Sequence, residues 1–224
     1  MPFLSRMEMV FKSPKSLFED FAERKKPDLM GFIVNVIISS LLITLGYYVQ
    51  YYKLYSCYLQ LVGGKVVDAR RFIWFNEIIP SSFRYTILML IYVLVLTLVP
   101  YLSCKGIFKK RTSFTLLLSI NGYLMSYMWI GLLISILILS RVPRVENVIL
   151  YPFMFSSFLI VIKEYTSQPI VMELLRASRI VNMACCAVVA VLFMISFSYV
   201  ITNKRNELIA LYVLTSATLV LLFL

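Results

Sequence analysis

The sequence of 224 residues contains no histidine. It therefore lacks the side chain that enzymes use most often as a general base and as a metal ligand. Its four cysteines form no Cys-x-x-Cys pair, and Cys185 and Cys186 lie inside an apolar run, where thiols behave as small hydrophobic groups. These absences disfavour a zinc site and a disulfide framework, and no cofactor is predicted.

Charged residues are also scarce. They make up 15% of the chain, whereas 61% is hydrophobic and the mean hydropathy is +0.86. A soluble core of this size cannot hide so many apolar residues, but a lipid bilayer can. The fold class predicted is all-α, a polytopic transmembrane helical bundle of five to six spans with an N-terminal amphipathic interfacial helix.

Residues that could perform chemistry in the membrane are missing as well. No Gly-x-Ser-x-Gly, His-Glu-x-x-His or glycine-rich phosphate loop occurs. The centres of the predicted spans carry no charge, and their polar residues Asn35, Asn121 and Asn182 are expected to hydrogen-bond to neighbouring helices. We therefore expect a protein that is not an enzyme.

The charge that is present is mostly positive, with 22 lysines and arginines against 11 acidic residues. In a membrane protein we interpret this excess as contact with anionic lipid headgroups at helix ends, and we expect no nucleic-acid partner. The basic residues proposed to bind lipid or a partner protein are Lys12, Lys15, Arg24, Lys25, Lys26, Lys109, Lys110 and Arg111. Counted over six spans, basic residues favour a cytoplasmic N-terminus by a narrow margin.

Two regions are predicted. Residues 1–28 form a basic amphipathic segment, whose helix begins at Ser13-Pro14 and ends before Pro27. Leu17, Phe18 and Phe21 share one face of this helix, which is expected to lie on the membrane surface. Residues 29–224 form the transmembrane helical domain.

Six apolar runs divide this domain, at residues 29–50, 85–102, 114–140, 148–162, 180–201 and 208–224. The third run is longer than the bilayer requires, so it is expected to tilt or to kink at Gly122 and Gly131. The fourth run is short and spans only if it extends through Tyr165; otherwise it is re-entrant. Tyrosines at the end of the first run are expected to form an aromatic belt.

Three short motifs resemble those of the Yip (Ypt-interacting protein) domain family. They are Ser13-Pro14 within Phe11–Phe18, then Asp28-Leu29-Met30-Gly31-Phe32, and then Ser113-Phe114 with Gly122-Tyr123. The family motif-matched residues are thus Ser13, Pro14, Asp28, Leu29, Gly31, Gly122 and Tyr123. Phe32 replaces a proline that the family often has, and the proline that often follows Tyr123 is absent. The sixth apolar run is a further departure, since the family typically has five spans.

The resemblance implies a non-enzymatic, multi-pass integral membrane protein. Eukaryotic members bind small GTPases and other membrane proteins in vesicle traffic, which implies a membrane scaffold that binds partners, including other membrane proteins or further copies of itself in a homo-oligomer. Two alternatives stay open from the residues alone. One is the permease subunit of an ABC-type exporter, and the other is an accessory subunit of a larger membrane complex.

Overall fold

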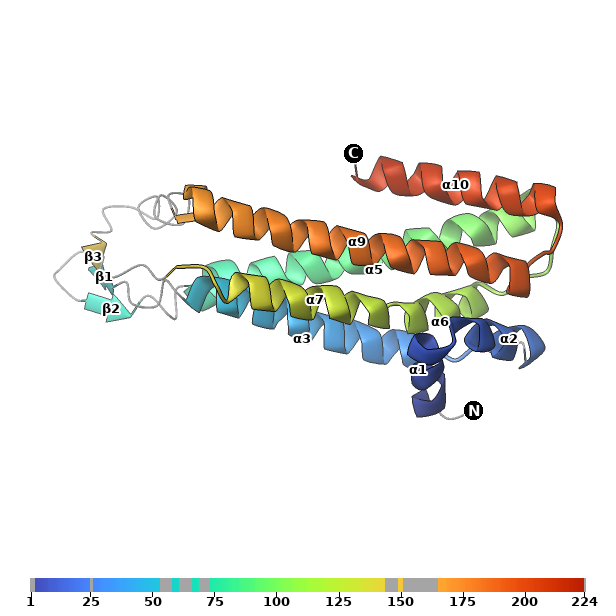
Figure 1. Cartoon of the computed structure of the whole chain (residues 1–224), viewed down its shortest axis with the longest axis horizontal. Coiled ribbons are helices and arrows are strands. Elements are labelled where there is room, and N and C mark those ends of the chain that lie inside the picture. Colours follow the sequence, from blue (N-terminus) through green and yellow to red (C-terminus); the bar gives the residue numbers. More distant parts are fainter. Residues whose placement is uncertain are drawn as a thin grey trace. The chain divides into compact units, whose positions relative to one another are not determined.

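The computed structural model describes residues 3–24, 26–52, 58–60, 66–68, 73–143, 149–150 and 165–223. The described helices are α1 (Phe3–Lys12), α2 (Pro14–Arg24), α3 (Met30–Tyr52), α5 (Ile79–Gly106), α6 (Phe114–Leu124), α7 (Ser126–Leu139), α9 (Pro169–Val200) and α10 (Arg205–Phe223) (Figure 1). A π-helix, η1 (Trp74–Ile78), leads directly into α5. Three short strands complete the described elements: β1 (Tyr58–Gln60), β2 (Val66–Asp68) and β3 (Ile149–Leu150). Strand β1 pairs antiparallel with β2 and parallel with β3.

Four stretches of helix are long and apolar enough to cross a membrane: Met30–Tyr51, Trp74–Gly106, Phe114–Leu139 and Pro169–Val200. The prediction of a helical chain with several possible membrane spans is confirmed. The first, second, third and fifth apolar runs lie almost entirely within these stretches. The sixth run lies within α10 apart from Leu224, which is outside the described residues, and the fourth lies outside them apart from Ile149–Leu150 in β3.

The third span differs in detail from its prediction. It consists of α6 and α7, which are separated by a single turn residue, Met125. The Met125 N–H donates to the carbonyl of Asn121 at 3.0 Å, and the ladder restarts when Met128 donates to Met125 at 2.8 Å. The interruption therefore falls three residues after Gly122. The expected kink at Gly131 was wrong, because α7 runs through that residue without a break.

The N-terminal segment contains one helix more than predicted. Helix α2 begins at Pro14 and ends at Arg24 as expected, but α1 precedes it. Leu17, Phe18 and Phe21 do share one face of α2, yet each is at most 1% exposed. This face therefore packs against the protein itself, and the position of the helix on the membrane surface stays a prediction.

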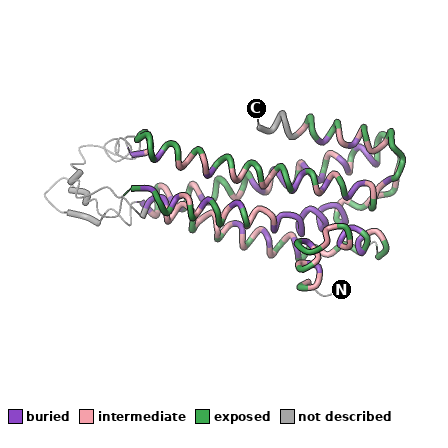
Figure 2. The backbone as a smooth tube through the Cα atoms, viewed as in Figure 1, coloured by how far each residue is buried: buried purple, intermediate pink, exposed green. Residues whose placement is uncertain are grey.

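The chain divides into two compact units. Unit 1 comprises residues 1–39, 86–130 and 184–224, and unit 2 comprises residues 40–85 and 131–183. Within unit 1, helices α1 and α2 contact each other and α6. Figure 2 shows α6 buried along most of its length, and every residue from Leu116 to Leu124 belongs to the buried class.

Two glycines allow close helix contact in unit 1. A Cβ atom added to Gly122 of α6 would lie 2.6 Å from Cβ and 2.7 Å from Cα of Phe32 in α3. A Cβ atom added to Gly31 of α3 would lie 2.5 Å from the Tyr123 ring. Neither space admits a methyl group, so the absence of a side chain at both positions lets α3 and α6 meet.

Unit 2 has a separate apolar cluster. Its buried members are Tyr51, Ile73, Ile78, Leu139, Val142, Tyr165 and Val171. They come from the end of α3, the approach to α5, the end of α7 and the beginning of α9. The cluster therefore joins the four ends of the apolar stretches that meet within unit 2.

We expect Gly122→Ala to destabilise the protein, because the added methyl meets backbone as well as side-chain atoms of Phe32. Overpacking of this kind costs about 1–3 kcal/mol. The measurement is thermal unfolding of the purified protein in detergent. The matched control is Gly106→Ala at the end of α5, where an added Cβ has nothing within 4 Å. Equal melting temperatures for the two variants would contradict the close contact of α3 with α6.

Candidate functional site

A buried arginine lies at the centre of the N-terminal segment. The Arg6 side chain on α1 is 5% exposed. Its Nε and Nη2 donate to Oδ2 of Asp20 on α2 at 3.0 and 2.9 Å, and its Nη1 donates to Oδ2 of Asp28 at 2.7 Å. Arg24 donates from Nε to the other oxygen of Asp20 at 2.6 Å. One guanidinium thus joins α1, α2 and the residue that introduces α3.

Asp28 connects this arginine to the membrane helices. Tyr123 of α6 donates its hydroxyl to Asp28 Oδ2 at 2.6 Å, and the Met30 N–H donates to Asp28 Oδ1 at 3.1 Å. The second bond caps the free N–H groups at the start of α3. The Asp28 N–H donates in turn to Ser119 Oγ of α6 at 2.9 Å. Asp28 therefore holds the start of α3 against α6 through both its backbone and its side chain.

The electrostatics follow from this arrangement. Burial would raise the pKa of Asp28, but hydrogen bonds from Tyr123, Met30 and Arg6 outweigh it and hold the pKa below its ordinary value. Burial would lower the pKa of Arg6, and its bonds to Asp28 and Asp20 raise it instead. Both groups are therefore charged at neutral pH.

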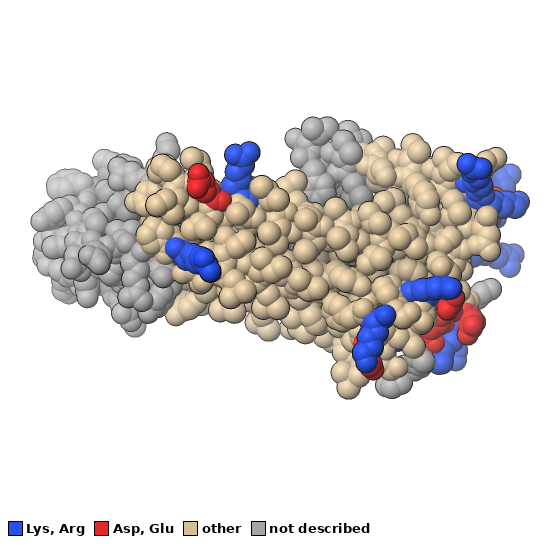
Figure 3. All heavy atoms as spheres, in the orientation of Figure 1, with Lys and Arg blue, Asp and Glu red and all other residues tan. Residues whose placement is uncertain are grey.

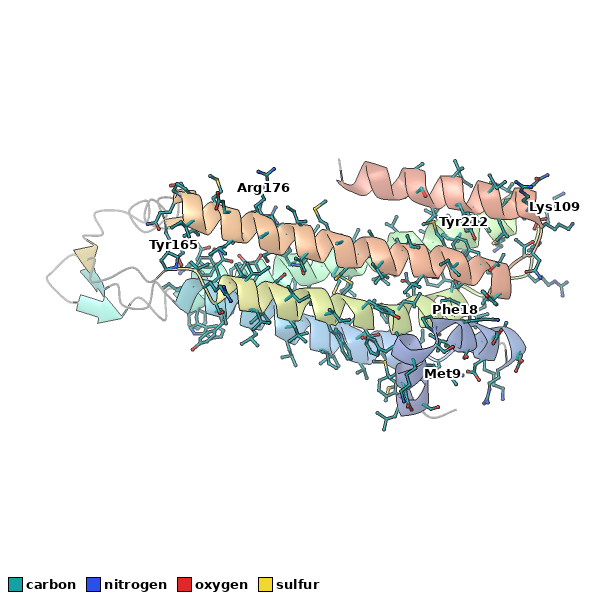
Figure 4. All side chains as sticks on the ribbon, in the orientation of Figure 1. Met9, Phe18, Lys109, Tyr165, Arg176 and Tyr212 are labelled. Atoms are coloured by element: carbon teal, nitrogen blue, oxygen red, sulfur yellow. The ribbon has the colours of Figure 1, made fainter. Side chains whose placement is uncertain are left out.

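Aromatic rings surround the ion pairs. The Arg6 guanidinium lies 4.5 Å from the centroid of the Phe21 ring, and the rings of Phe3 and Phe21 lie 5.8 and 6.0 Å from that of Tyr123. Phe18 points into the protein and meets the ring of Tyr199 on α9 at 6.0 Å (Figure 4). These contacts shield the Arg6–Asp20 pair in particular from water, and a less polar surrounding strengthens such a pair.

A second polar contact joins two connections of unit 1. Lys110, in the connection between α5 and α6, forms an ion pair with Glu207 at the start of α10. Thr202 donates its hydroxyl to the same carboxylate at 2.5 Å. In unit 1, the charged side chains visible in Figure 3 gather over α1, α2 and the beginning of α10.

The structure brings together four of the motif-matched residues: Asp28, Gly31, Gly122 and Tyr123 meet where α3 and α6 touch. Leu29 lies beside them but is 38% exposed. Ser13 and Pro14 form the junction of α1 and α2, where the Ser13 and Ser16 hydroxyls are 2.8 Å apart.

The proposed basic residues are more dispersed. Lys12 and Lys15 form exposed pairs with Glu8 and Glu19, at 2.5 and 3.7 Å. Lys26, Lys109 and Arg111 are exposed, Lys110 is half-buried in its ion pair, and Lys25 lies outside the described residues. Of the seven that the structure describes, Arg24 alone touches the ion-pair network around Arg6.

Sequence reasoning missed Arg6 and the role of Asp20. Asp20 pairs with Arg24 four residues later on α2, and it is also only 8% exposed and bound to Arg6. The available signal was an arginine on the apolar side of a helical pattern, near Phe3 and Val10. Nothing local indicated that its partners follow 14 and 22 residues later.

The predicted hydrogen bond from a span asparagine to a neighbouring helix is confirmed for Asn121, whereas Asn35 bonds within its own helix. Asn121 of α6 donates to Thr97 Oγ1 at 3.1 Å and to the Val93 carbonyl of α5 at 3.2 Å. Asn35 donates to the Gly31 carbonyl within its own helix at 2.7 Å. In the part of the chain that the structure describes, no three His, Cys, Asp or Glu side chains are grouped to hold a metal ion.

The fold and this junction define a class: a multi-pass helical membrane protein whose N-terminal helices are fastened by ion pairs to the ends of its spans. The Yip1 domain family matches residues 9–224, and the chain belongs to that family. Its members are generally non-enzymatic and are linked to Rab proteins and vesicle traffic. Comparisons with curated proteins and with solved structures gave no match.

We expect Arg6→Gln to release α1 and α2 from α6, because it leaves Asp20 and Asp28 without their shared cation. Breaking a fully buried pair costs about 3–5 kcal/mol, and about half of that is expected here because Asp28 is partly exposed. Faster hydrogen exchange of residues 3–24 would report the release. The control Lys12→Gln removes an exposed pair on the same helix and should leave exchange unchanged. Unchanged exchange in Arg6→Gln would show that the ion pairs do not hold the segment.

Proposed function

We propose that this protein is a membrane scaffold that binds partner proteins in membrane organisation or traffic, and that its N-terminal helices form the binding surface. The observation that carries the proposal is the network around Arg6, which fixes α1 and α2 to the residues matching the family motifs. A surface held in one geometry loses less conformational entropy on binding than a mobile segment does.

The outward side of the N-terminal helices has the composition of a binding surface. Leu4 and Phe11 of α1 are 77% and 46% exposed, although most apolar residues of α1 and α2 are covered. Lys12 and Lys15 are exposed beside their partners Glu8 and Glu19. Apolar side chains bordered by charges of both signs suit a protein surface that offers apolar groups and complementary charges.

The same surface suits anionic lipid headgroups, which the basic residues are proposed to contact. The family link to small GTPases supports a cytoplasmic position for it. The basic connection 107–113 lies on the same membrane face, because α3 and α5 together cross the membrane twice. This agrees with the rule that basic connections stay in the cytoplasm.

We further propose five membrane crossings, namely α3, α5, the joined α6 and α7, α9, and α10. Three contacts each join two points that are distant along the chain. Two points in contact lie on the same membrane face, so an even number of crossings must separate them. Phe18 packs on Tyr199, so the N-terminal helices and the end of α9 share a membrane face. Lys110 pairs with Glu207, so the α5–α6 connection shares that face with the start of α10.

The third contact lies in unit 2. Leu139 and Val142 after α7 join the same cluster as Tyr165 and Val171 before α9. A single additional crossing between them would separate these ends by the thickness of the hydrocarbon core, about 30 Å. Helix α10 has 19 residues and, at about 1.5 Å per residue, is close to that thickness.

Five crossings place the N- and C-termini on opposite faces of the membrane, whereas six place them on the same face. We expect protease to remove an epitope tag from only one terminus in sealed, oriented vesicles. Permeabilised vesicles serve as the control for accessibility of both tags. Simultaneous protection, or simultaneous loss, of the two tags would contradict five crossings.

The partner is best identified by photo-crosslinking in native membranes, with the crosslinking residue at Leu4 of α1. The matched control position is Leu137 of α7, which is 67% exposed and lies in a membrane span. We expect Leu4 to capture defined proteins, among them small GTPases or other multi-pass membrane proteins, and Leu137 to capture mainly lipid. A stoichiometric ATPase captured from Leu4, or the same proteins from both positions, would contradict the scaffold.

A further inference from the structure

Unit 2 contains a cavity of about 440 Å³. It lies among the C-terminal part of α3, the first turns of α5, the end of α7 and the first turns of α9. All four of these helix ends face the membrane side opposite to the N-terminus, because successive spans alternate in direction. The volume is within the range of small-molecule sites, about 300–1,000 Å³.

Two arginines line this cavity. Arg84 comes from α5 and Arg179 from α9, and no aspartate or glutamate is among the lining residues. Neither arginine forms an ion pair with a carboxylate of the described residues. Glu77 reaches the lining only indirectly, by accepting a hydrogen bond from Tyr51 at 3.5 Å. The cavity therefore presents two positive charges that lack a described counter-ion.

The arginines also mark a depth in the membrane. Residues 85–104 of α5 and residues 180–203 after Arg179 carry no charge. About 20 uncharged residues of helix span the hydrocarbon core. Arg84 and Arg179 therefore both lie at the headgroup boundary, where α5 and α9 leave the hydrocarbon.

The rest of the lining is divided between polar and apolar groups. Tyr47, Gln50 and Tyr51 of α3 supply hydroxyl and amide groups near the arginines, and Leu42, Ile43 and Ile136 form apolar wall. An arginine that only anchors a helix end turns outward, as Arg176 does on the outer side of α9 (Figure 4). Arg84 and Arg179 are exposed as well, but they differ from Arg176 in that both line one cavity, from two different helices.

We propose that this cavity binds an anionic phospholipid from the leaflet opposite to the N-terminus. The phosphate accepts hydrogen bonds from Arg84 and Arg179, a pairing for which guanidinium geometry is well suited. The first part of an acyl chain lies against Leu42, Ile43 and Ile136. The site is independent of the partner surface on α1 and α2, which belongs to unit 1.

The test is native mass spectrometry of the full-length protein with bound lipid. Phosphatidylglycerol is compared with phosphatidylcholine of the same acyl chains, because the two differ in net charge but not in apolar volume. We expect the wild-type protein to retain one phosphatidylglycerol in preference to phosphatidylcholine. The double variant Arg84→Gln with Arg179→Gln should retain it at least about tenfold more weakly, since two charge-assisted hydrogen bonds are lost.

The matched control is Arg176→Gln, which removes an exposed arginine one turn away and should retain phosphatidylglycerol like the wild type. Gly46→Leu is a second variant, which keeps both arginines and fills the cavity from α3. An added Cβ at Gly46 lies 3.7 Å from Ile136 Cγ1, an ordinary van der Waals contact, and Gly46 lines the cavity into which the rest of the side chain would extend. It should also lose the lipid, which keeps the test decisive if the double arginine variant fails to fold.

An excess of inorganic phosphate distinguishes a lipid from a free anion. Phosphatidylglycerol that stays bound in the presence of inorganic phosphate supports a phospholipid as the ligand of the cavity. Displacement of the lipid by inorganic phosphate alone would overturn it in favour of a soluble phosphate ligand. Retention of phosphatidylglycerol by both Gly46→Leu and the double arginine variant would overturn the site altogether.

Discussion

The Asp28 carboxylate is the interaction on which unit 1 depends. It lies just before the first span, and its neighbours come from three other parts of the chain: Arg6 of α1, Tyr123 of α6 and, through Arg6, Asp20 of α2. A partly buried carboxylate is costly unless its charge and its hydrogen bonds are satisfied together. Here both conditions are met only when α1, α2, α3 and α6 are assembled. The close contact at Gly31 and Gly122 then sets how near α3 and α6 approach.

The sequence predicts much of this fold because the bilayer is a demanding solvent. Long uncharged runs have few alternatives to spanning helices, so four of the six predicted runs lie within helices long enough to span. The start of α2 at Pro14 follows from local chemistry, since proline suits the first turn of a helix. The motif residues Asp28, Gly31, Gly122 and Tyr123 were visible in the sequence, although not the fact that they touch.

What the sequence could not provide are partners distant along the chain. Arg6 lies on the apolar side of the α1 pattern, and Asp20 and Asp28, which follow far along the chain, make its burial favourable. Periodicity likewise shows that a face of α2 is apolar, but not what covers that face. The sequence predicted that the third span tilts or kinks at Gly122 and Gly131. The break in the helix lies instead at Met125, a residue without an unusual side chain. The proposal of five crossings depends on contacts such as that of Lys110 with Glu207, which a hydropathy pattern does not contain.

The distance along the chain between Asp28 and Tyr123 has a consequence for how the protein is made. The two residues are separated by 95 positions. At ribosomal rates of about 5–20 residues per second, roughly 5–20 s pass between the synthesis of one and of the other. During that interval Leu17, Phe18 and Phe21 have no α6 to cover them, and Asp28 lacks the hydrogen bond from Tyr123. The apolar face of the N-terminal helices therefore stays uncovered until α6 has been made, which makes early synthesis the stage at which a chaperone or the insertion machinery has most to protect.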